Sequence, residues 1–422
     1  MSHTNLAMRL LGSRTKTPSR YYFDNAARTV IHPVALQTLS TALKQVYGNP
    51  SASYLEGITA HDALYRARES IAELVGCKAE EMLFTSCGTE SNNLVLRAAC
   101  LNFKKKYPRV KGVIIISSVE HPSISKTAIE VGNLFGYEVV TLPVMANGLI
   151  HLDAFVTTVT TYKDRIAIMS IIHGQNEVGV CQDIRMLVKM AREIIGPSVP
   201  IHSDMTQVFG KVTVDLTTLG VSFATGSAHK FHGPPGVGLL YINKEFTHII
   251  TPETSTMSGG GQESGSRSGT ENVPGILATE AALRVCVADK LKFAHIEARL
   301  RDLKEFIWVT LRKKIQGLQL NSILHNRYSL PNIISLTFPA GYHGHIIAQK
   351  LDESKNIAIN SGSACSKNKK GSVTLLSMGR TEDEAHRTIR ISMSSFTTPE
   401  EVSYLCKSII EVYYEMASEK QK

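Results

Sequence analysis

The sequence lacks any long hydrophobic run: no stretch approaches the roughly 18 to 20 consecutive apolar residues that a membrane-spanning helix requires. It also lacks a C-x-x-C pair, and its seven cysteines are odd in number. We therefore expect no membrane partner, no disulfide framework and no metal site. The cysteine pattern favours a reducing compartment.

Acidic residues are missing from residues 1–23, which contain four lysines and arginines together with several serines and threonines. This composition fits a short mitochondrial presequence, and it equally fits a disordered tail. We favour a basic tail over residues 1–20. The cytoplasm is then the expected location, with the mitochondrion as the alternative.

Concentrated positive charge is also missing, although the net charge is +9 over 422 residues. The basic residues are spread along the chain, with only short runs such as 104–106 and 367–370, and no zinc-finger or RNP motif accompanies them. We therefore expect solvated basic faces and no nucleic-acid partner. A hydrophobic content of 43% allows a sizeable core and more than one domain.

Short apolar runs alternate with segments of helical periodicity through most of the chain. Strands are predicted at 82–84, 113–117, 138–142, 166–172, 199–202, 222–225 and 239–242. Such alternation predicts an α/β fold with a mainly parallel sheet covered by helices on both faces. We expect a large domain over 21–280, whose first ~15 residues pack on the other domain, and a smaller α+β domain over 281–422.

Polar residues follow four of the predicted strands: His121, Asn176, Asp204 and Lys230. Ligands of parallel sheets bind at the carboxyl ends of the strands, so these side chains are expected to converge. Taken singly, each has an ordinary alternative. His121 is either a loop histidine or a ring stacked on a flat cofactor, and Asp204 is either a turn acid or the partner of a protonated pyridine nitrogen.

Lys230 lies on a short turn between small hydroxyl residues and a Gly-Pro-Pro-Gly segment at 233–236. A lysine held in this way suits a Schiff base with an aldehyde cofactor. An ordinary surface lysine beside a loop is equally compatible with this sequence. The junction at 85–93, rich in small and hydroxyl residues, also allows two interpretations. It is either an ordinary helix cap or an anion site built from free backbone N–H groups.

Seven motifs occur together in one order: EHP at 120–122, QNEVG at 175–179, DMTQ at 204–207, SAHK at 227–230, GGGQE at 259–263, RSGT at 267–270 and SGSAC at 361–365. In this order the chain resembles the cysteine desulfurase and selenocysteine lyase family, class V of the fold-type I pyridoxal-phosphate enzymes. The resemblance extends over about 21–416. It implies an α/β fold with pyridoxal 5'-phosphate as cofactor and a homodimer.

The resemblance also assigns roles. Lys230 would carry the cofactor and move the substrate proton, His121 would stack on the ring, and Cys365 would accept the sulfur. Further residues would hold the cofactor or the substrate carboxylate. The cofactor would be held by Gly88, Thr89, Asp204, Gln207, Ser227, His229 and, from the other subunit, Thr270; the carboxylate would be bound by Asn176 and Arg390.

The implied reaction converts L-cysteine to L-alanine and leaves a persulfide on Cys365, which would pass sulfur to acceptor or scaffold proteins of iron–sulfur cluster or thiolation pathways. The motifs at 361–365 and 269–274 favour this reading, whereas those at 117–121 and 230–234 suggest a lyase acting on L-selenocysteine. An inactive binding protein with the same fold is a third alternative. Departures from the family pattern at Arg28, at 87–88, at Ser264 and at 394–395 remove no residue with a direct chemical role.

Overall fold

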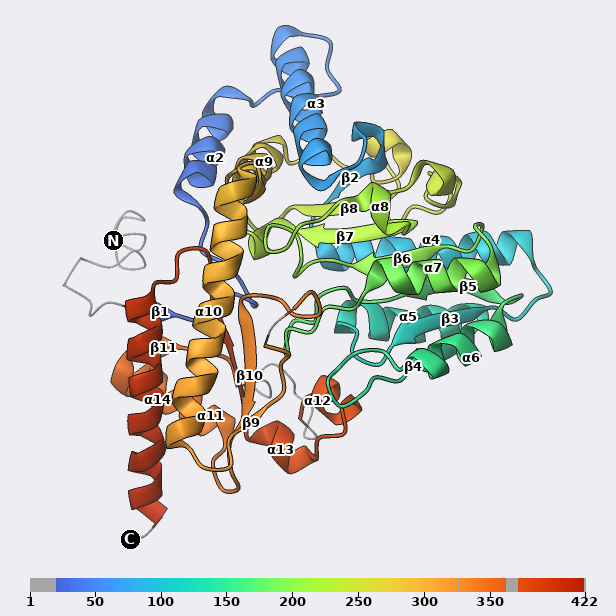
Figure 1. Ribbon diagram of the computed structural model, residues 1–422. Helices are drawn as coiled ribbons and strands as arrows, with labels where there is room; N and C mark the ends of the chain where they lie inside the picture. The colour runs from blue at the N-terminus through green and yellow to red at the C-terminus, as the bar shows by residue number, and fades with distance from the viewer. Residues whose placement is uncertain (1–19, 325, 362–370, 421–422) are drawn as a thin grey trace, which may run out of the picture.

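The computed structural model describes residues 20–324, 326–361 and 371–420 (Figure 1). Cys365, the predicted sulfur acceptor, lies outside these ranges, as do the tail residues 1–19.

A seven-stranded sheet forms the centre of the larger part of the molecule. Its strands, in spatial order, are β2 (Met82–Thr85), β8 (Gly238–Ile242), β7 (Phe223–Ser227), β6 (Ile201–Asp204), β5 (Ile166–Ser170), β3 (Val113–Ser117) and β4 (Glu138–Leu142). All neighbouring pairs are parallel except those made by β8, which runs antiparallel to β2 and β7. The predicted α/β class with a mainly parallel sheet is confirmed.

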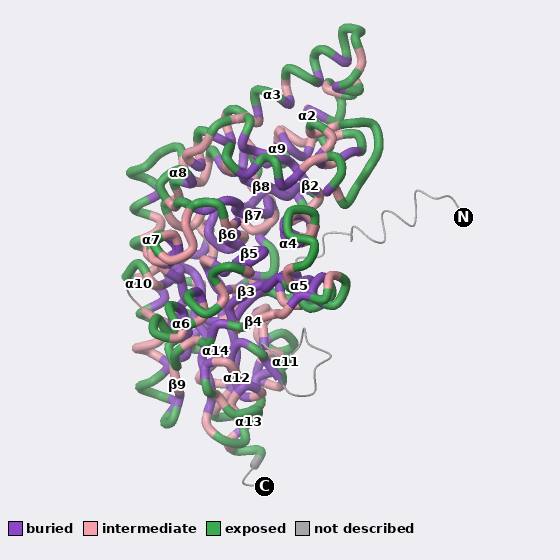
Figure 2. Tube along the Cα trace, turned by 90° about the vertical axis from the view of Figure 1, so that its right-hand side faces the viewer, coloured by how far each residue is buried: buried purple, intermediate pink, exposed green. Residues whose placement is uncertain are grey.

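Helices cover both faces of this sheet, which explains why strands such as β3 and β5 are almost continuously apolar. On β3, Ile114 and Ile116 pack with α4 (Gly88–Lys106) and α5 (Pro122–Phe135). The alternate residues Val113 and Ile115 belong to the core on the opposite face, where α6 (Leu152–Tyr162) and α7 (Ile184–Ile195) pack together and α8 (Leu216–Leu219) adjoins α7. Successive side chains of a strand point to opposite faces, so a strand buried on both sides needs apolar residues throughout. Figure 2 shows the strands buried within a more exposed outer layer.

A second, smaller core surrounds an antiparallel sheet of order β12–β10–β9. This sheet consists of β9 (Gln319–Leu320), β10 (Ile333–Thr337) and β12 (Thr388–Ser392), and the helices that pack in its core are α10 (Lys290–Lys314), α11 (Gly344–Lys355) and α14 (Pro399–Lys420). The short helices α12 (Val373–Ser377) and α13 (Glu382–His386) form a separate small cluster with Val178 and Val180. The N-terminal strand β1 (Tyr21–Tyr22) pairs with β11 (Ile357–Ala358) beside this core. The division at residue 280 stays a prediction.

Three helices form the end of the molecule above the large sheet in Figure 1: α2 (Pro33–Gln45), α3 (Leu55–Val75) and α9 (Val273–Val287). Helix α9 packs against both α2 and α3. The outer faces of α2 and α3 nevertheless carry large exposed apolar side chains.

The predicted boundaries agree best where a run is bounded by clear turn residues, as for 113–117 and 138–142, which are identical to β3 and β4. The run at 199–202 is displaced: β6 begins at Ile201 and continues to Asp204, because Asp204 pairs in register with Thr225 of β7. The strand predicted at 166–172 ends at Ser170.

Candidate active site

A cavity of about 480 Å³ lies at the carboxyl ends of the parallel strands and extends to β12 of the smaller core. This volume falls in the range of small-molecule sites. The predicted site residues that line it are Gly88, Thr89, His121, Asn176, Asp204, Gln207, Ser227, His229, Lys230 and Arg390. The convergence expected from the strand ends is therefore present.

Lys230 ends a 3₁₀ turn, Ala228–Lys230, that directly follows β7. Its Nζ donates hydrogen bonds to the carbonyl oxygens of Ala26 (2.8 Å) and Ala27 (2.7 Å). Burial, with the positive charge of Arg390, lowers the pKa of Lys230 to about 8. An amine that loses its proton this readily is suited both to nucleophilic attack and to proton transfer near neutral pH. The alternative of an ordinary surface lysine does not fit this position.

Asp204 is the last residue of β6 and is only 4% exposed. Its Oδ2 accepts a hydrogen bond from Asn92 Nδ2, and its Oδ1 accepts one from the backbone N–H of Thr206, each at 2.9 Å. Donors to both oxygens fix the orientation of the carboxylate. A fixed anion of this kind can hold a protonated ring nitrogen.

His121 is the N-cap of α5, and Pro122 occupies the first helical position, where proline is favoured. Its Nδ1 accepts a hydrogen bond from the backbone N–H of Ser123 at 3.1 Å, so the ring proton resides on Nε2. Desolvation by the surrounding protein lowers the pKa of His121, and the charge of Lys230 acts in the same direction. The result is a neutral ring at the cavity wall, which suits stacking on a flat aromatic group.

The N-terminus of α4 provides an anion site at one end of the cavity. Cys87 is the N-cap but its side chain forms no capping hydrogen bond, which leaves backbone N–H groups of Gly88 and Thr89 available. Ser227 Oγ and His229 Nδ1 lie 3.0 Å apart beside it. Burial lowers the pKa of His229 to about 4, and the charge of Lys230 contributes; His229 is therefore a neutral hydrogen-bonding group.

The opposite side of the cavity contains Arg390 of β12. Its Nη2 pairs with Asp24 Oδ1 at 2.5 Å, and its Nη1 donates to the backbone oxygen of Asn176 at 2.8 Å. Its Nε is buried and has no hydrogen-bond partner among the described residues. A fixed guanidinium with a free N–H suits a carboxylate ligand.

One predicted residue in the described part of the chain, Thr270, is not brought to the cavity. Thr270 is exposed and does not line it, and Cys365 lies outside the described residues. The sequence reasoning, in turn, missed Asp24, Asn92 and Glu120, which contact or line the site. Asn92 and Glu120 lie within the segments 85–93 and 120–122 noted in the sequence, but the local sequence does not indicate which residues they contact.

Glu120 is 9% exposed and bridges the ends of two strands. Its Oε1 accepts hydrogen bonds of 2.6 Å from Ser117 Oγ and from the backbone N–H of Ile172, whereas its Oε2 is buried and unpartnered among the described residues. Burial raises the pKa of Glu120 to about 8, and the nearby Asp204 adds to the rise. The surroundings of Glu120 therefore favour its protonated form at neutral pH.

The cavity fits the parts of pyridoxal phosphate. Lys230 suits the aldehyde carbon, Asp204 the ring nitrogen, His121 the ring face, and the α4 N-terminus the phosphate. None of the described helices is long and apolar enough to cross a membrane. The described residues also contain no cluster of three or more His, Cys, Asp or Glu side chains arranged for a metal ion. Fold and cavity together define an α/β enzyme of the pyridoxal-phosphate class.

Comparison with known proteins identifies the family. The model of the aminotransferase class-V family matches residues 21–405. The chain is 35% identical over 407 residues to "Cysteine desulfurase IscS" of Dictyoglomus turgidum, covering 95% of this chain and 97% of that protein. The chain therefore belongs to the aminotransferase class-V family, and its cofactor is pyridoxal phosphate.

Solved structures of similar proteins agree with this family assignment. A "NIFS-LIKE PROTEIN" superposes with a TM-score of 0.83 at 30% identity, covering 94% of this chain and all (100%) of that one. A structure titled "SspA in complex with cysteine" superposes with a TM-score of 0.73 at 27% identity, covering 90% of this chain and 100% of that one.

Proposed function

We propose that this protein is a pyridoxal-phosphate-dependent cysteine desulfurase, which converts L-cysteine to L-alanine and transfers the sulfur to Cys365. The observation that carries the proposal is that Lys230 and Arg390 line one cavity, together with the residues that would hold the cofactor. An amino acid substrate presents an α-carboxylate and a proton on Cα. Arg390 is placed to bind the carboxylate, and Lys230 is placed to take up the proton.

Pyridoxal phosphate, when bound, supplies an electron sink that stabilises negative charge at the substrate Cα. The chain supplies the remaining functions. Asp204 holds the ring nitrogen in its protonated form, and Lys230, with a pKa lowered to about 8, takes up and returns the Cα proton at its Nζ. Arg390 and Asn176 orient the substrate carboxylate from the side of β12.

The proposed role of Cys365 rests on its sequence motif alone. As a thiolate it would attack the substrate sulfur, so that a sulfur–sulfur bond forms while the carbon–sulfur bond breaks. An ordinary thiol with a pKa of about 8.5 is only a few per cent ionised at pH 7. Nearby cations such as Lys367, Lys369 and Lys370 in the sequence would increase the thiolate fraction.

The test measures sulfide and alanine released from L-cysteine, and selenide and alanine released from L-selenocysteine, by the wild type and by Cys365→Ala. We expect Cys365→Ala to abolish release of sulfur from cysteine while the cofactor remains bound. Cys406→Ala is the matched control, because Cys406 is a buried free thiol of the small core, remote from the cavity. Undiminished cysteine turnover by Cys365→Ala would contradict the persulfide role.

The selenocysteine lyase alternative is decided by the same assay. A wild type that releases selenide but no sulfide favours the lyase, and comparable release of both favours the desulfurase. Purified protein that stays colourless after addition of pyridoxal phosphate would instead indicate an inactive binding protein.

We also propose that the active form is a homodimer. Helices α2 and α3, with the N-cap residue of α3, expose apolar side chains that a monomer rarely leaves uncovered: Leu36, Leu43, Tyr54, Leu55, Ile58 and Tyr65. A second copy would cover them and supply Thr270 to the phosphate end of the cavity. Sedimentation equilibrium of the wild type and of Leu55→Glu tests this; a wild type that is monomeric at micromolar concentration and fully active would refute it.

We also propose a cellular location for the protein and acceptors for its sulfur. We expect a cytoplasmic protein that delivers sulfur to acceptor or scaffold proteins, with the mitochondrion as the alternative address. Fractionation of cells that express the chain with and without residues 1–20 distinguishes the two compartments.

A further inference from the structure

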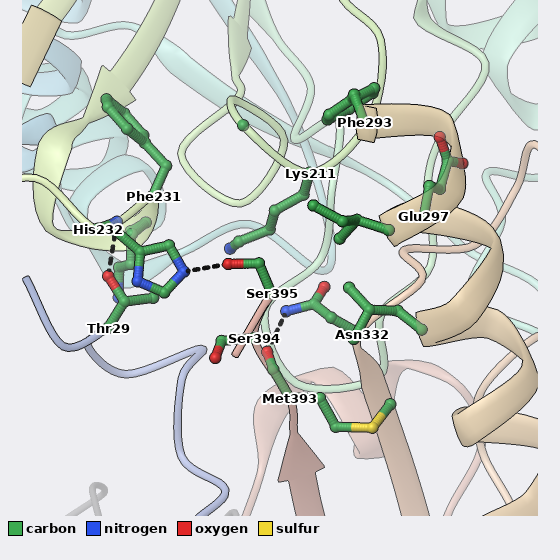
Figure 3. A pocket seen from close by; sticks show the side chains of 14 residues that line it. Thr29, Lys211, Phe231, His232, Phe293, Glu297, Asn332, Met393, Ser394 and Ser395 are labelled. Atoms are coloured by element: carbon green, nitrogen blue, oxygen red, sulfur yellow. Dashed lines mark hydrogen bonds between the residues drawn. The ribbon is translucent and has the colours of Figure 1, made fainter. Parts of the chain in front are cut away.

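Behind the cofactor cavity lies a second, much smaller cavity of about 30 Å³, between the two cores. One wall consists of Thr29 and the segment around Lys211, and the other of α10 and residues next to β10 and β12 (Figure 3). The described residues that line it include Lys230, which also lines the cofactor cavity. The two cavities therefore share a wall.

Lys211 connects the two cavities. Its Nζ donates a hydrogen bond of 2.6 Å to Oε1 of Gln207, four residues earlier, while its side chain lines the smaller cavity. Figure 3 shows this side chain extending into the space that Ser395, Asn332 and Glu297 also border. Glu297 is already paired with Arg301 at 2.6 Å, and no described carboxylate forms an ion pair with Lys211.

Gln207 has both ends of its amide engaged. Nε2 donates to the carbonyl oxygen of Ala26 at 2.8 Å, the same oxygen that accepts from Lys230. A carbonyl oxygen only accepts, so the contact with Ala26 fixes the orientation of the amide, with Oε1 facing the Nζ of Lys211. That orientation leaves the second hydrogen of Nε2 for an acceptor in the cofactor cavity.

On the far side of the smaller cavity is an unsatisfied group. Asn332 is 2% exposed, and its Nδ2 donates to the carbonyl oxygen of Met393 at 3.1 Å, but its Oδ1 is buried without a partner among the described residues. A buried polar atom without a partner is costly, and a space of this size accommodates a water molecule where polar groups surround it. The ammonium of Lys211, with hydrogens beyond the one given to Gln207, offers the complementary donor.

We propose that Lys211 is a positioning residue of the cofactor site: it holds the Gln207 amide from behind, with Nε2 presented to the cofactor, and ordered water in the small cavity links its ammonium to Asn332. The inference rests on pyridoxal phosphate being the cofactor. It does not depend on whether cysteine or selenocysteine is the substrate.

The test is a double-mutant cycle of Lys211→Met and Gln207→Ala, read by the visible absorption maximum of the bound cofactor and by its dissociation constant. We expect Lys211→Met to shift the absorption maximum and to weaken cofactor binding by about 3- to 10-fold, the usual effect of one hydrogen bond. In the Gln207→Ala background the same change should have little further effect, because residues that act as a unit are not additive. Lys189→Met, at an exposed lysine of α7, is the control.

An absorption maximum and affinity unchanged by Lys211→Met in a folded protein, or equal shifts in both backgrounds, would overturn the positioning role. If Lys211→Met does not fold by circular dichroism, Lys211→Leu, which also removes the donor, takes its place in the cycle. A crystal structure of the holoenzyme should contain water within hydrogen-bond distance of both Lys211 Nζ and Asn332 Oδ1, and a dry cavity would refute that link. Wild-type turnover is measured in parallel, so that an inactive wild type with normal cofactor binding would count against the proposed function alone.

Discussion

Arg390 Nη2 and Asp24 Oδ1 lie 2.5 Å apart, which joins β12 of the smaller core to the segment that follows β1. Asp24 also accepts a hydrogen bond from Asn360 Nδ2 at 3.2 Å. Both side chains of the pair are largely buried. The pair therefore restrains the guanidinium, which lines the cavity, to one orientation, with its Nε buried and unpartnered among the described residues.

Replacement of Arg390 by glutamine should weaken substrate binding. A hydrogen bond between charged groups is worth about 1.5–3 kcal/mol, so we expect KM for cysteine to rise by about 10- to 100-fold, with cofactor affinity little changed. Steady-state kinetics and cofactor titration measure the two effects. Arg380→Gln, on the smaller core and bonded to Gln319, should leave both unchanged. An unaltered KM in Arg390→Gln would remove this residue from the substrate site.

Lys230→Ala should prevent covalent attachment of the cofactor and reduce turnover by at least about 10²- to 10⁴-fold, the usual contribution of a positioned acid–base group. Borohydride reduction followed by mass spectrometry measures the attachment directly. Lys126→Ala, an exposed lysine at the edge of the same cavity, provides the control. Cofactor mass retained on the Lys230→Ala chain would assign the attachment to another lysine.

Asp204→Asn keeps the side-chain shape but removes the negative charge opposite the ring nitrogen. We expect kcat to fall by about 10²- to 10³-fold, as when one preorganised electrostatic group is lost, and the absorption spectrum of the bound cofactor to change. Asp153→Asn, on the exposed side of α6, should change neither. A kcat within two- or threefold of wild type, about the scatter of single-site effects, would argue against a role for Asp204 at the ring.

Glu120 should make stability depend on pH. Its pKa is raised to about 8 in the folded protein, so the native state holds this proton at pH values where the unfolded chain, with the ordinary value of 4.5, has lost it. The unfolded state then binds fewer protons, and this group lowers the free energy of unfolding by about 1.4 kcal/mol per pH unit between roughly pH 5 and 8. Glu120→Gln should flatten that decline.

Denaturant unfolding of the wild type and Glu120→Gln across this pH range measures the difference. Glu69→Gln, at an exposed position on α3, should follow the wild type. Identical slopes for the wild type and Glu120→Gln would mean that Glu120 is ionised in the folded protein.

Much of the fold could be predicted because most strands of the large sheet are buried on both faces and flanked by turns. Continuous apolar runs such as 113–117 are recognisable without any knowledge of their neighbours. The antiparallel placement of β8 between β2 and β7 could not be predicted, because strand order depends on pairings between distant segments. The same holds for β1, which pairs with β11 more than 300 residues later in the chain, Tyr21 opposite Ile357.

By itself, the sequence determined which chemical groups are present and that the strand ends bring most of them together. Lys230 and His121 each follow a strand of one mainly parallel sheet and Asp204 ends one, and the geometry of such a sheet places their side chains at one edge. Only the tertiary structure decided their chemical state. The lowered pKa of Lys230, the protonated Glu120, the Asp24–Arg390 pair and the contact from Lys211 to Gln207 all depend on burial and on partners from other elements, which no local run of residues specifies.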